Sequence, residues 1–281
     1  MPETGPIVVL PGRPLTVGEL LDSAVLLLRT RASVLLTLSA ALAVGEQLLL
    51  LPLRTAAGAT APLWWAPGMS GLGFFWFLLA VGAATEAMII LLLGNPAARA
   101  AGGALLGHRV TAGELLRPGG ARWGATALLG AMVGAVMLLV SLLGPGWLVG
   151  FALLGAVAPA LVVDRVTPVR AIARSATLAL RVDGRAAAVR VLGYLVWWIV
   201  RVGLGWGMFT GLTTLGMIPD GWSTAVAMLL WAAVNTVAYA ALACLDAVVH
   251  LETRIRTEGL DIHLSRAPAT GTPAQLLAVG G

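Results

Sequence analysis

The chain has 281 residues, of which 59% are hydrophobic and only 11% are charged. Soluble domains carry about 25% charged residues, so this composition excludes an ordinary water-soluble fold and indicates a protein embedded in a lipid bilayer. The net charge of +5 comes from arginines that flank apolar stretches, which favours anionic lipid headgroups over nucleic acid as the partner of this charge.

Six apolar stretches are long enough to cross the ~30 Å hydrocarbon core of a bilayer, which takes about 20 helical residues. They predict transmembrane helices over residues 32–53, 72–93, 125–143, 147–163, 191–209 and 223–249. The third and fourth are separated only by Gly144-Pro145-Gly146, which predicts a tight hairpin. The fold class predicted is therefore all-α: a polytopic membrane helical bundle of six transmembrane helices.

Arginine placement predicts how this bundle is oriented. The chain contains no lysine, and all its arginines except Arg54 and Arg201 lie before the first span, between the second and third, between the fourth and fifth, or after the sixth. In a six-span chain these segments share one side of the membrane, and basic residues collect on the cytoplasmic side. We therefore expect a multi-pass protein of the cell (plasma) membrane with cytoplasmic N- and C-termini.

Short amphipathic helices are predicted on the cytoplasmic side, each just before a pair of spans. Residues 16–19 (TVGE) have the pattern of a capping box, and residues 111–114 (TAGE) repeat it. Before the fifth span, Thr167 followed by Pro168 is typical of a helix start. The pattern indicates three repeats of an interfacial helix followed by a transmembrane hairpin.

The third of these helices, residues 168–182, has one polar and one apolar face. Arg170, Arg174 and Arg181 recur at helical spacing on the polar face. One interpretation is a helix that lies in the headgroup plane and contacts anionic lipid headgroups through these arginines. The other is a solvated cytoplasmic helix packed on its neighbours. The hydrophobic pattern alone does not choose between them.

Three ionisable residues lie at membrane depth: Glu46, Glu86 and Arg201. Each costs at least ~2.5 to 3.5 kcal/mol when it faces lipid at the bilayer centre, so all three are expected to face the bundle interior, and Asn235 in the sixth span is expected to join them. Counted along the spans at ~1.5 Å per residue, Glu86 is nearest to Arg201 in depth. We therefore predict Glu86 as the first partner of Arg201 and Glu46 as the second.

This intramembrane polar cluster has two interpretations. In the first, an Arg–Glu ion pair fixes the register of the helices and is structural. In the second, the cluster lines a polar cavity that binds a small solute or passes protons. The first is favoured, because ion pairs inside membranes also serve folding. A continuous polar cavity that reaches the midplane would favour transport, whereas a dry, closed bundle would favour a structural role.

The sequence carries no catalytic or metal-binding signature. A nucleophilic serine beside a glycine-rich turn, paired intramembrane aspartates and an H-E-x-x-H motif are all absent. The three histidines, His108, His250 and His263, fall in different segments without the spacing of metal ligands. We therefore predict no catalytic residues, no metal and no cofactor.

Three stretches carry a resemblance to a known family: residues 13–22 (RPLTVGELLD), residues 158–164 (APALVVD) with 171–181, and residues 251–261 (LETRIRTEGLD). They are similar to actinobacterial integral membrane proteins named for the glycerophosphoryl diester phosphodiesterase membrane domain. The resemblance implies a membrane fold and location more than an activity. In other proteins of that family the membrane segment is attached to a soluble phosphodiesterase barrel of about 250 residues, for which this chain has no room.

The expected domain organisation is a flexible segment over residues 1–15, a single six-helix membrane domain over residues 16–266 and a disordered tail over residues 267–281. The expected function is that of a non-enzymatic membrane scaffold or accessory subunit, with protein partners at the cytoplasmic face and no nucleic acid. The alternative is a small transporter or lipid-handling protein that uses the intramembrane polar cluster.

Overall fold

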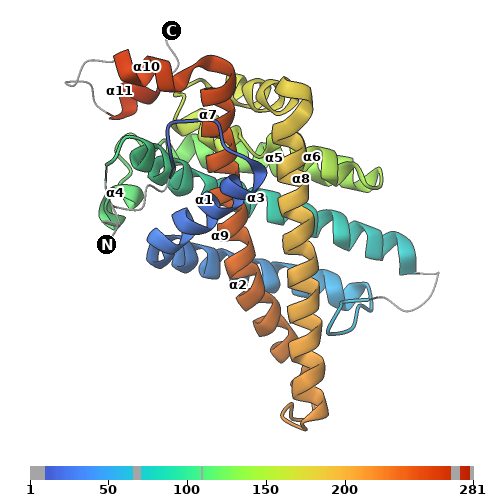
Figure 1. The fold of residues 1–281 in the computed structure, drawn as a ribbon. Helices are drawn as coiled ribbons and strands as arrows, with labels where there is room; N and C mark the ends of the chain where they lie inside the picture. The colour runs from blue at the N-terminus through green and yellow to red at the C-terminus, as the bar shows by residue number, and fades with distance from the viewer. Residues whose placement is uncertain (1–9, 66–70, 109, 267–272, 279–281) are drawn as a thin grey trace, which may run out of the picture.

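The computed structural model describes residues 10–65, 71–108, 110–266 and 273–278, most of which are helical (Figure 1). Within these ranges no strand forms beyond one isolated bridge between Thr60 and Trp65. Five long helices are apolar enough to cross a membrane: α2 (Ala32–Ala56), α3 (Leu72–Leu105), α5 (Trp123–Leu142), α8 (Pro168–Thr214) and α9 (Ser223–Glu258). The predicted all-α helical bundle is confirmed, and the five long apolar helices suit a membrane.

Short helices precede two of the hairpins, as predicted: α1 (Val17–Thr30) lies before α2, and α4 (Ala112–Leu116) lies before α5. Both capping boxes form. The N–H of Thr16 donates to Glu19 Oε2 at 2.8 Å, and the N–H of Thr111 donates to Glu114 Oε2 at 2.6 Å. Each threonine hydroxyl in turn accepts the N–H of its glutamate at 3.3 Å. Two helix starts are therefore specified locally by four side chains.

The fourth predicted span is not one helix. Residues 147–163 form α6 (Gly146–Leu154) and α7 (Val157–Val162), separated at Gly155 and Ala156. Pro159 has no backbone N–H, and its ring clashes with the carbonyl of Gly155 in a continuous helix, so the helix breaks here. The described chain thus has five helices of spanning length, one fewer than the six predicted, and α6 with α7 occupies the place of the missing one.

Ser175 of α8 fills the break between α6 and α7. Its hydroxyl donates to the carbonyl of Leu153 at 2.6 Å and accepts the N–H of Ala156 at 3.1 Å. Gly155 is required at this point, because a Cβ there would lie 2.4 Å from Asp246 Oδ1. The backbone groups freed by the break are therefore satisfied by a neighbouring helix.

The predicted interfacial helix 168–182 and the fifth predicted span join into α8. The backbone leaves helical geometry between Arg181 and Gly184, where Val182, Asp183 and Gly184 have φ of 51°, 55° and 73°. The left-handed conformation suits glycine and is unusual for valine. α8 is therefore two helices joined by a sharp turn, which places the predicted interfacial helix at an angle to the span.

α9 is the central helix of the bundle. It packs against α1, α2, α3 and α8, and every side chain of residues 238–255 is buried. α3 packs closely on α5, where a Cβ at Gly134 would lie 3.4 Å from the carbonyl oxygen of Ala84. α8 and α9 run together, and their connected ends extend farthest from the short helices α10 (Leu260–Arg266) and α11 (Pro273–Leu277) (Figure 1).

The prediction that residues 1–15 are flexible does not hold for residues 10–15, which the structure describes. Leu10 and Leu15 belong to the main hydrophobic core, and each is only 2% exposed. Burial of two leucine side chains anchors residues 10–15 on the bundle. Residues 1–9 lie outside the described ranges.

The prediction that residues 267–281 are disordered also does not hold for residues 273–277. Residues 273–277 form α11, and Leu277 is buried in the main core. Its side chain lies against Gly102 of α3, where a Cβ would be 2.7 Å from Leu277 Cδ1, so the absence of a side chain there makes room for the leucine. Residues 267–272 and 279–281 lie outside the described ranges.

We expect Ser175→Ala to lower the unfolding midpoint of the protein in detergent. The change leaves the carbonyl of Leu153 and the N–H of Ala156 buried without a partner, at a cost of about 1–3 kcal/mol each. Thr177→Ala is the matched control, because Thr177 is exposed and bonds only to a carbonyl of its own helix. Equal midpoints for the two variants would contradict this account of the break.

Candidate functional site

An intramembrane polar cluster forms between α2, α3, α8 and α9. It contains all four residues predicted to meet there, and every member except the half-buried Thr85 is buried. The members are Glu46 of α2, Thr85 and Glu86 of α3, Tyr194 and Arg201 of α8, and Asn235 and Tyr239 of α9.

Arg201 pairs with Glu86, the first partner predicted for it, and that prediction is confirmed. Nη1 of Arg201 lies 2.7 Å from Oε1 of Glu86. The second carboxylate oxygen accepts the hydroxyl of Tyr194 at 3.1 Å. The guanidinium carbon also lies 5.6 Å from the ring centre of Tyr194 and 5.6 Å from that of Tyr239, within the range in which aromatic faces attract a cation.

Glu46 is bonded by neutral donors. Its Oε2 accepts the hydroxyl of Tyr239 at 2.7 Å and the amide N–H of Asn235 at 3.2 Å. Its Oε1 accepts the hydroxyl of Thr85 at 3.0 Å. Among the described residues Arg201 makes its ion pair with Glu86 and not with Glu46, the second partner predicted. Only one of the two acids is therefore neutralised by direct contact.

Sequence reasoning missed the two tyrosines, although the chain contains only 2. Both lie in predicted spans, and each shares a helix with a cluster residue: Tyr194 with Arg201, and Tyr239 with Asn235. A buried phenol hydroxyl needs a hydrogen-bond partner. Two tyrosines at membrane depth therefore indicate that polar side chains lie near them inside the bundle.

Two small cavities lie within the bundle, one of them beside the cluster. One of about 20 Å³ is lined mainly by apolar side chains of α3, α5 and α6 and by Asp246. The other, of about 10 Å³, lies between Tyr194 and the buried ion pair of Arg190 with Asp246, whose Nε and Oδ1 are 3.1 Å apart. Cavities of this size hold about one water molecule each. The cavity beside Tyr194 is therefore too small for a solute larger than water.

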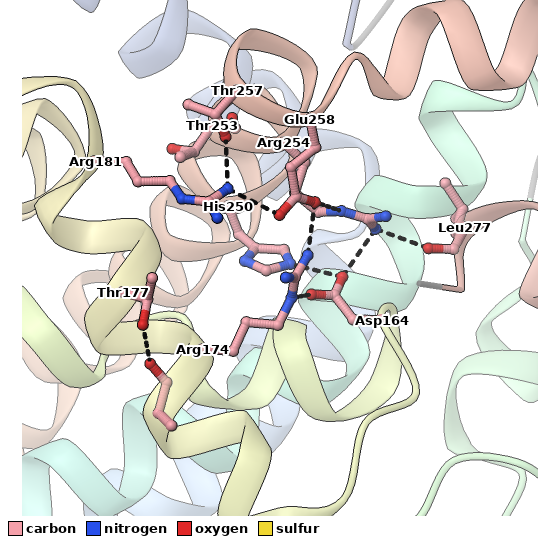
Figure 2. A network of polar contacts seen from close by, with 11 residues as sticks. Asp164, Arg174, Thr177, Arg181, His250, Thr253, Arg254, Thr257, Glu258 and Leu277 are labelled. Atoms are coloured by element: carbon pink, nitrogen blue, oxygen red, sulfur yellow. Dashed lines mark hydrogen bonds and ion pairs between the residues drawn. The ribbon is translucent and has the colours of Figure 1, made fainter. Parts of the chain in front are cut away.

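A second polar network ties together one end of the bundle, and Figure 2 shows the part of it around Asp164 and Glu258. We call it the end network. Its members are Leu15, Asp164, Arg174, Arg181, Arg185, His250, Glu252, Arg254, Arg256, Glu258 and Leu277.

Asp164, which follows α7, is at the centre of the end network. Its Oδ1 accepts Nη1 of Arg254 at 2.8 Å and lies 2.9 Å from Nε2 of His250, while its Oδ2 pairs with Arg174. Burial alone would raise the pKa of Asp164, but the neighbouring His250, Arg254 and Arg174 outweigh it and lower the pKa to about 2. Asp164 is therefore ionised and links the loop after α7 to α8 and α9.

Glu258 at the end of α9 gathers three arginines. Its carboxylate accepts Arg174 at 2.7 Å, Arg254 at 3.1 Å and Arg181 at 3.2 Å (Figure 2). Arg254 also donates to the carbonyl of Leu277 at 2.7 Å. The end of α9 is thereby joined to the first part of α8 and to α11.

Leu15 is held at its backbone by the other half of the end network. Its carbonyl accepts Arg185 at 2.8 Å and Arg256 at 3.0 Å, and its N–H donates to Glu252 at 3.3 Å. Glu252 also accepts Arg185 at 3.1 Å and Arg256 at 2.6 Å. The segment before α1 is thus fixed to α8 and α9.

The three stretches that carry the family resemblance meet in the end network. Residues 13–22 contribute Leu15, residues 158–164 contribute Asp164, residues 171–181 contribute two arginines, and residues 251–261 contribute the acids and arginines of α9. Sequence reasoning did not foresee these contacts, although the same stretches had already been singled out. In this structure their contacts hold the segment before α1, the loop after α7, α8 and α9 together at one end of the bundle.

The structure corrects the prediction that Arg170, Arg174 and Arg181 all contact lipid headgroups. The side chain of Arg174 is only 17% exposed and pairs with Asp164 and Glu258, because the loop after α7 lies against this helix. Arg181 is 42% exposed and shares its charge with Glu258. Arg170 is exposed, and its contact with lipid headgroups stays a prediction.

The described residues bring no three His, Cys, Asp or Glu side chains together as metal ligands. Comparisons of the chain with protein-family models, with curated proteins and with solved structures find no match. The intramembrane polar cluster and the end network are therefore the features from which a function is inferred.

We expect Arg201→Leu to destabilise the protein by about 3–5 kcal/mol, because it leaves Glu86 buried without its cation. The double variant Arg201→Leu with Glu86→Leu should recover much of that loss, since no uncompensated charge remains. Unfolding in detergent, followed by circular dichroism, gives the coupling energy of the pair. Additive losses in the double variant would show that the ion pair does not hold α3 to α8.

Proposed function

We propose that the protein is a non-enzymatic integral membrane scaffold or accessory subunit of the cell membrane, and that the end fastened by the end network lies in the cytoplasm and binds a protein partner. The observation that carries the proposal is the end network itself. Ion pairs join the loop after α7, α8 and α9 into one unit, and hydrogen bonds of Glu252 and Arg254 with backbone groups add the segment before α1 and α11 to it. Such a unit presents a rigid surface, which lowers the entropic cost of binding.

The outward side of the first part of α8 supplies the contact surface. Val169 is 74% exposed, Leu180 is 63% exposed, and Val182 and Arg170 are also exposed. We call these four residues the α8 surface. Apolar side chains accompanied by arginine are typical of protein interfaces and of the headgroup region of a membrane. A partner with apolar and acidic groups fits this surface.

The family resemblance supports the same proposal. In other proteins of that family the membrane segment accompanies a soluble domain, so a role beside another protein or domain fits the resemblance. The ion pair of Arg201 with Glu86 supports it as well, because it joins α8 to α3 within the bundle.

The alternative is a small transporter or lipid-handling protein. The observation in its favour is that Glu46 lacks an ionic partner in the cluster. The cavity beside Tyr194 holds about one water molecule, which is too small for a solute and favours the scaffold.

A partner should co-purify with the protein from its native membrane in a mild detergent. We expect Val169→Asp with Leu180→Asp to abolish the co-purification, because two charges replace the apolar part of the α8 surface. Leu215→Asp with Met217→Asp is the matched control: these side chains are 73% and 64% exposed, but they lie just beyond the opposite end of α8. A partner that is retained by the first variant, or lost equally from both, would contradict the assignment.

Cysteine labelling tests the orientation. In a Cys244→Ala background, a probe that does not cross membranes should label Thr60→Cys and Pro219→Cys on intact cells. Thr111→Cys and Ile262→Cys should react only after permeabilisation. All four positions are exposed in the structure, so burial does not explain a difference. The reverse pattern would place the end network outside the cell.

A further inference from the structure

The intramembrane polar cluster contains two acids and only one cation in contact with them. We propose that Glu46 and Glu86 together bind one exchangeable proton, held by Glu46 in this structure, and that Arg201 determines which acid holds it. The ligand is a proton, and the site lies in the apolar interior. This goes beyond a scaffold role and does not depend on it.

Charge balance is the first argument. Glu46 is 5% exposed, Glu86 is 7% exposed, and Arg201 neutralises only Glu86. The other cation near Glu46 is Arg54 of α2, but its guanidinium donates to Gln47 at 2.9 Å and lies 4.1 Å from the ring centre of Trp64. With both acids ionised the cluster would carry an uncompensated negative charge, which an apolar interior strongly disfavours. One proton removes it.

Hydrogen-bond geometry is the second argument. The hydroxyl oxygen of Thr85 lies 3.0 Å from Oε1 of Glu46, and also 2.9 Å from the carbonyl of Gly82 and 3.1 Å from that of Val81. When Glu46 is ionised, Thr85 donates to it. When Glu46 is protonated, its O–H donates to Thr85, which then donates to its own helix. Both states are satisfied without movement of the heavy atoms.

The remaining contacts of Glu46 serve both states. The donors from α9, the hydroxyl of Tyr239 and the amide of Asn235, reach Oε2, so they are retained whether or not Oε1 carries a proton. Hydrogen-bond donors that point at the carboxylate disfavour a metal cation at this position, because their partly positive hydrogens would repel it. The donor set therefore favours a proton over a metal ion.

The position of Arg201 is the third argument. Its guanidinium lies 5.6 Å from the ring centres of two tyrosines, of which Tyr194 bonds to Glu86 and Tyr239 bonds to Glu46. Its buried Nε has no hydrogen-bond partner in the described part of the chain. A second state with Arg201 on Glu46 and the proton on Glu86 has the same net charge. The site therefore has two ways of balancing two acids with one arginine and one proton.

Infrared spectroscopy of the full chain in detergent tests the proposal, because a protonated carboxyl has a carbonyl band that a carboxylate lacks. We expect the band in the wild type at neutral pH and its loss in Glu46→Gln. Glu86→Gln should also lose it, since Glu46 then ionises to neutralise Arg201. Glu19→Gln, at an exposed position of α1, should leave it unchanged. A band equally strong in the wild type and Glu46→Gln, or unchanged in Glu86→Gln, would overturn the proposal.

The pH dependence of unfolding gives a second readout that does not need every variant to be equally stable. If folded Glu46 holds a proton that the unfolded chain releases, the folded state binds more protons, and wild-type stability falls as the pH rises from about 5 to about 8. Glu46→Gln carries no such proton. The difference between its midpoint and that of the wild type should therefore shift in favour of the variant as the pH rises, whichever protein is more stable at pH 5. A difference that stays constant over this range would show that Glu46 is ionised in the folded protein.

Discussion

The ion pair between Arg201 and Glu86 joins α8 to α3 in a region where both side chains are buried. A guanidinium stays charged at any realistic pH, so α8 can pack in the bundle only with Arg201 turned toward an acid. That rotation also turns Tyr194 toward Glu86. α9 packs on both α3 and α8, so the orientation of α9 about its own axis depends on these two helices. In that orientation Tyr239 of α9 reaches Glu46.

The end network likewise pairs acids with arginines, at one end of the bundle and with more members. Asp164, Glu252 and Glu258 each collect two or more arginines from segments far apart in the sequence. The planar guanidinium suits this task, because it donates in several directions at once. Arg254, for example, bonds to Asp164, Glu258 and the carbonyl of Leu277. The arginines that indicate orientation in the sequence therefore also hold the chain together.

Features that depend on neighbouring residues were predictable from the sequence. The capping boxes at Thr16 and Thr111 need only residues three apart, so their bonds follow from local geometry. The pairing of Arg201 with Glu86 was predictable because a charge at membrane depth leaves few alternatives. Pro159 indicated that the helix could be interrupted four residues earlier, at Gly155. The continuous apolar sequence, however, does not show whether residues 147–163 form one helix or two.

By itself the sequence determined that the protein is a bundle of long apolar helices with its few internal charges turned inward, because lipid and buried charge impose that on any such chain. Only the tertiary structure decided which partners those charges find. Arg174 turns from the predicted lipid surface to Asp164 and Glu258, and Leu277 docks on Gly102, because distant segments are brought against them. Glu46 meets three neutral polar side chains for the same reason: their positions follow from how α2, α3 and α9 pack, which no local pattern encodes.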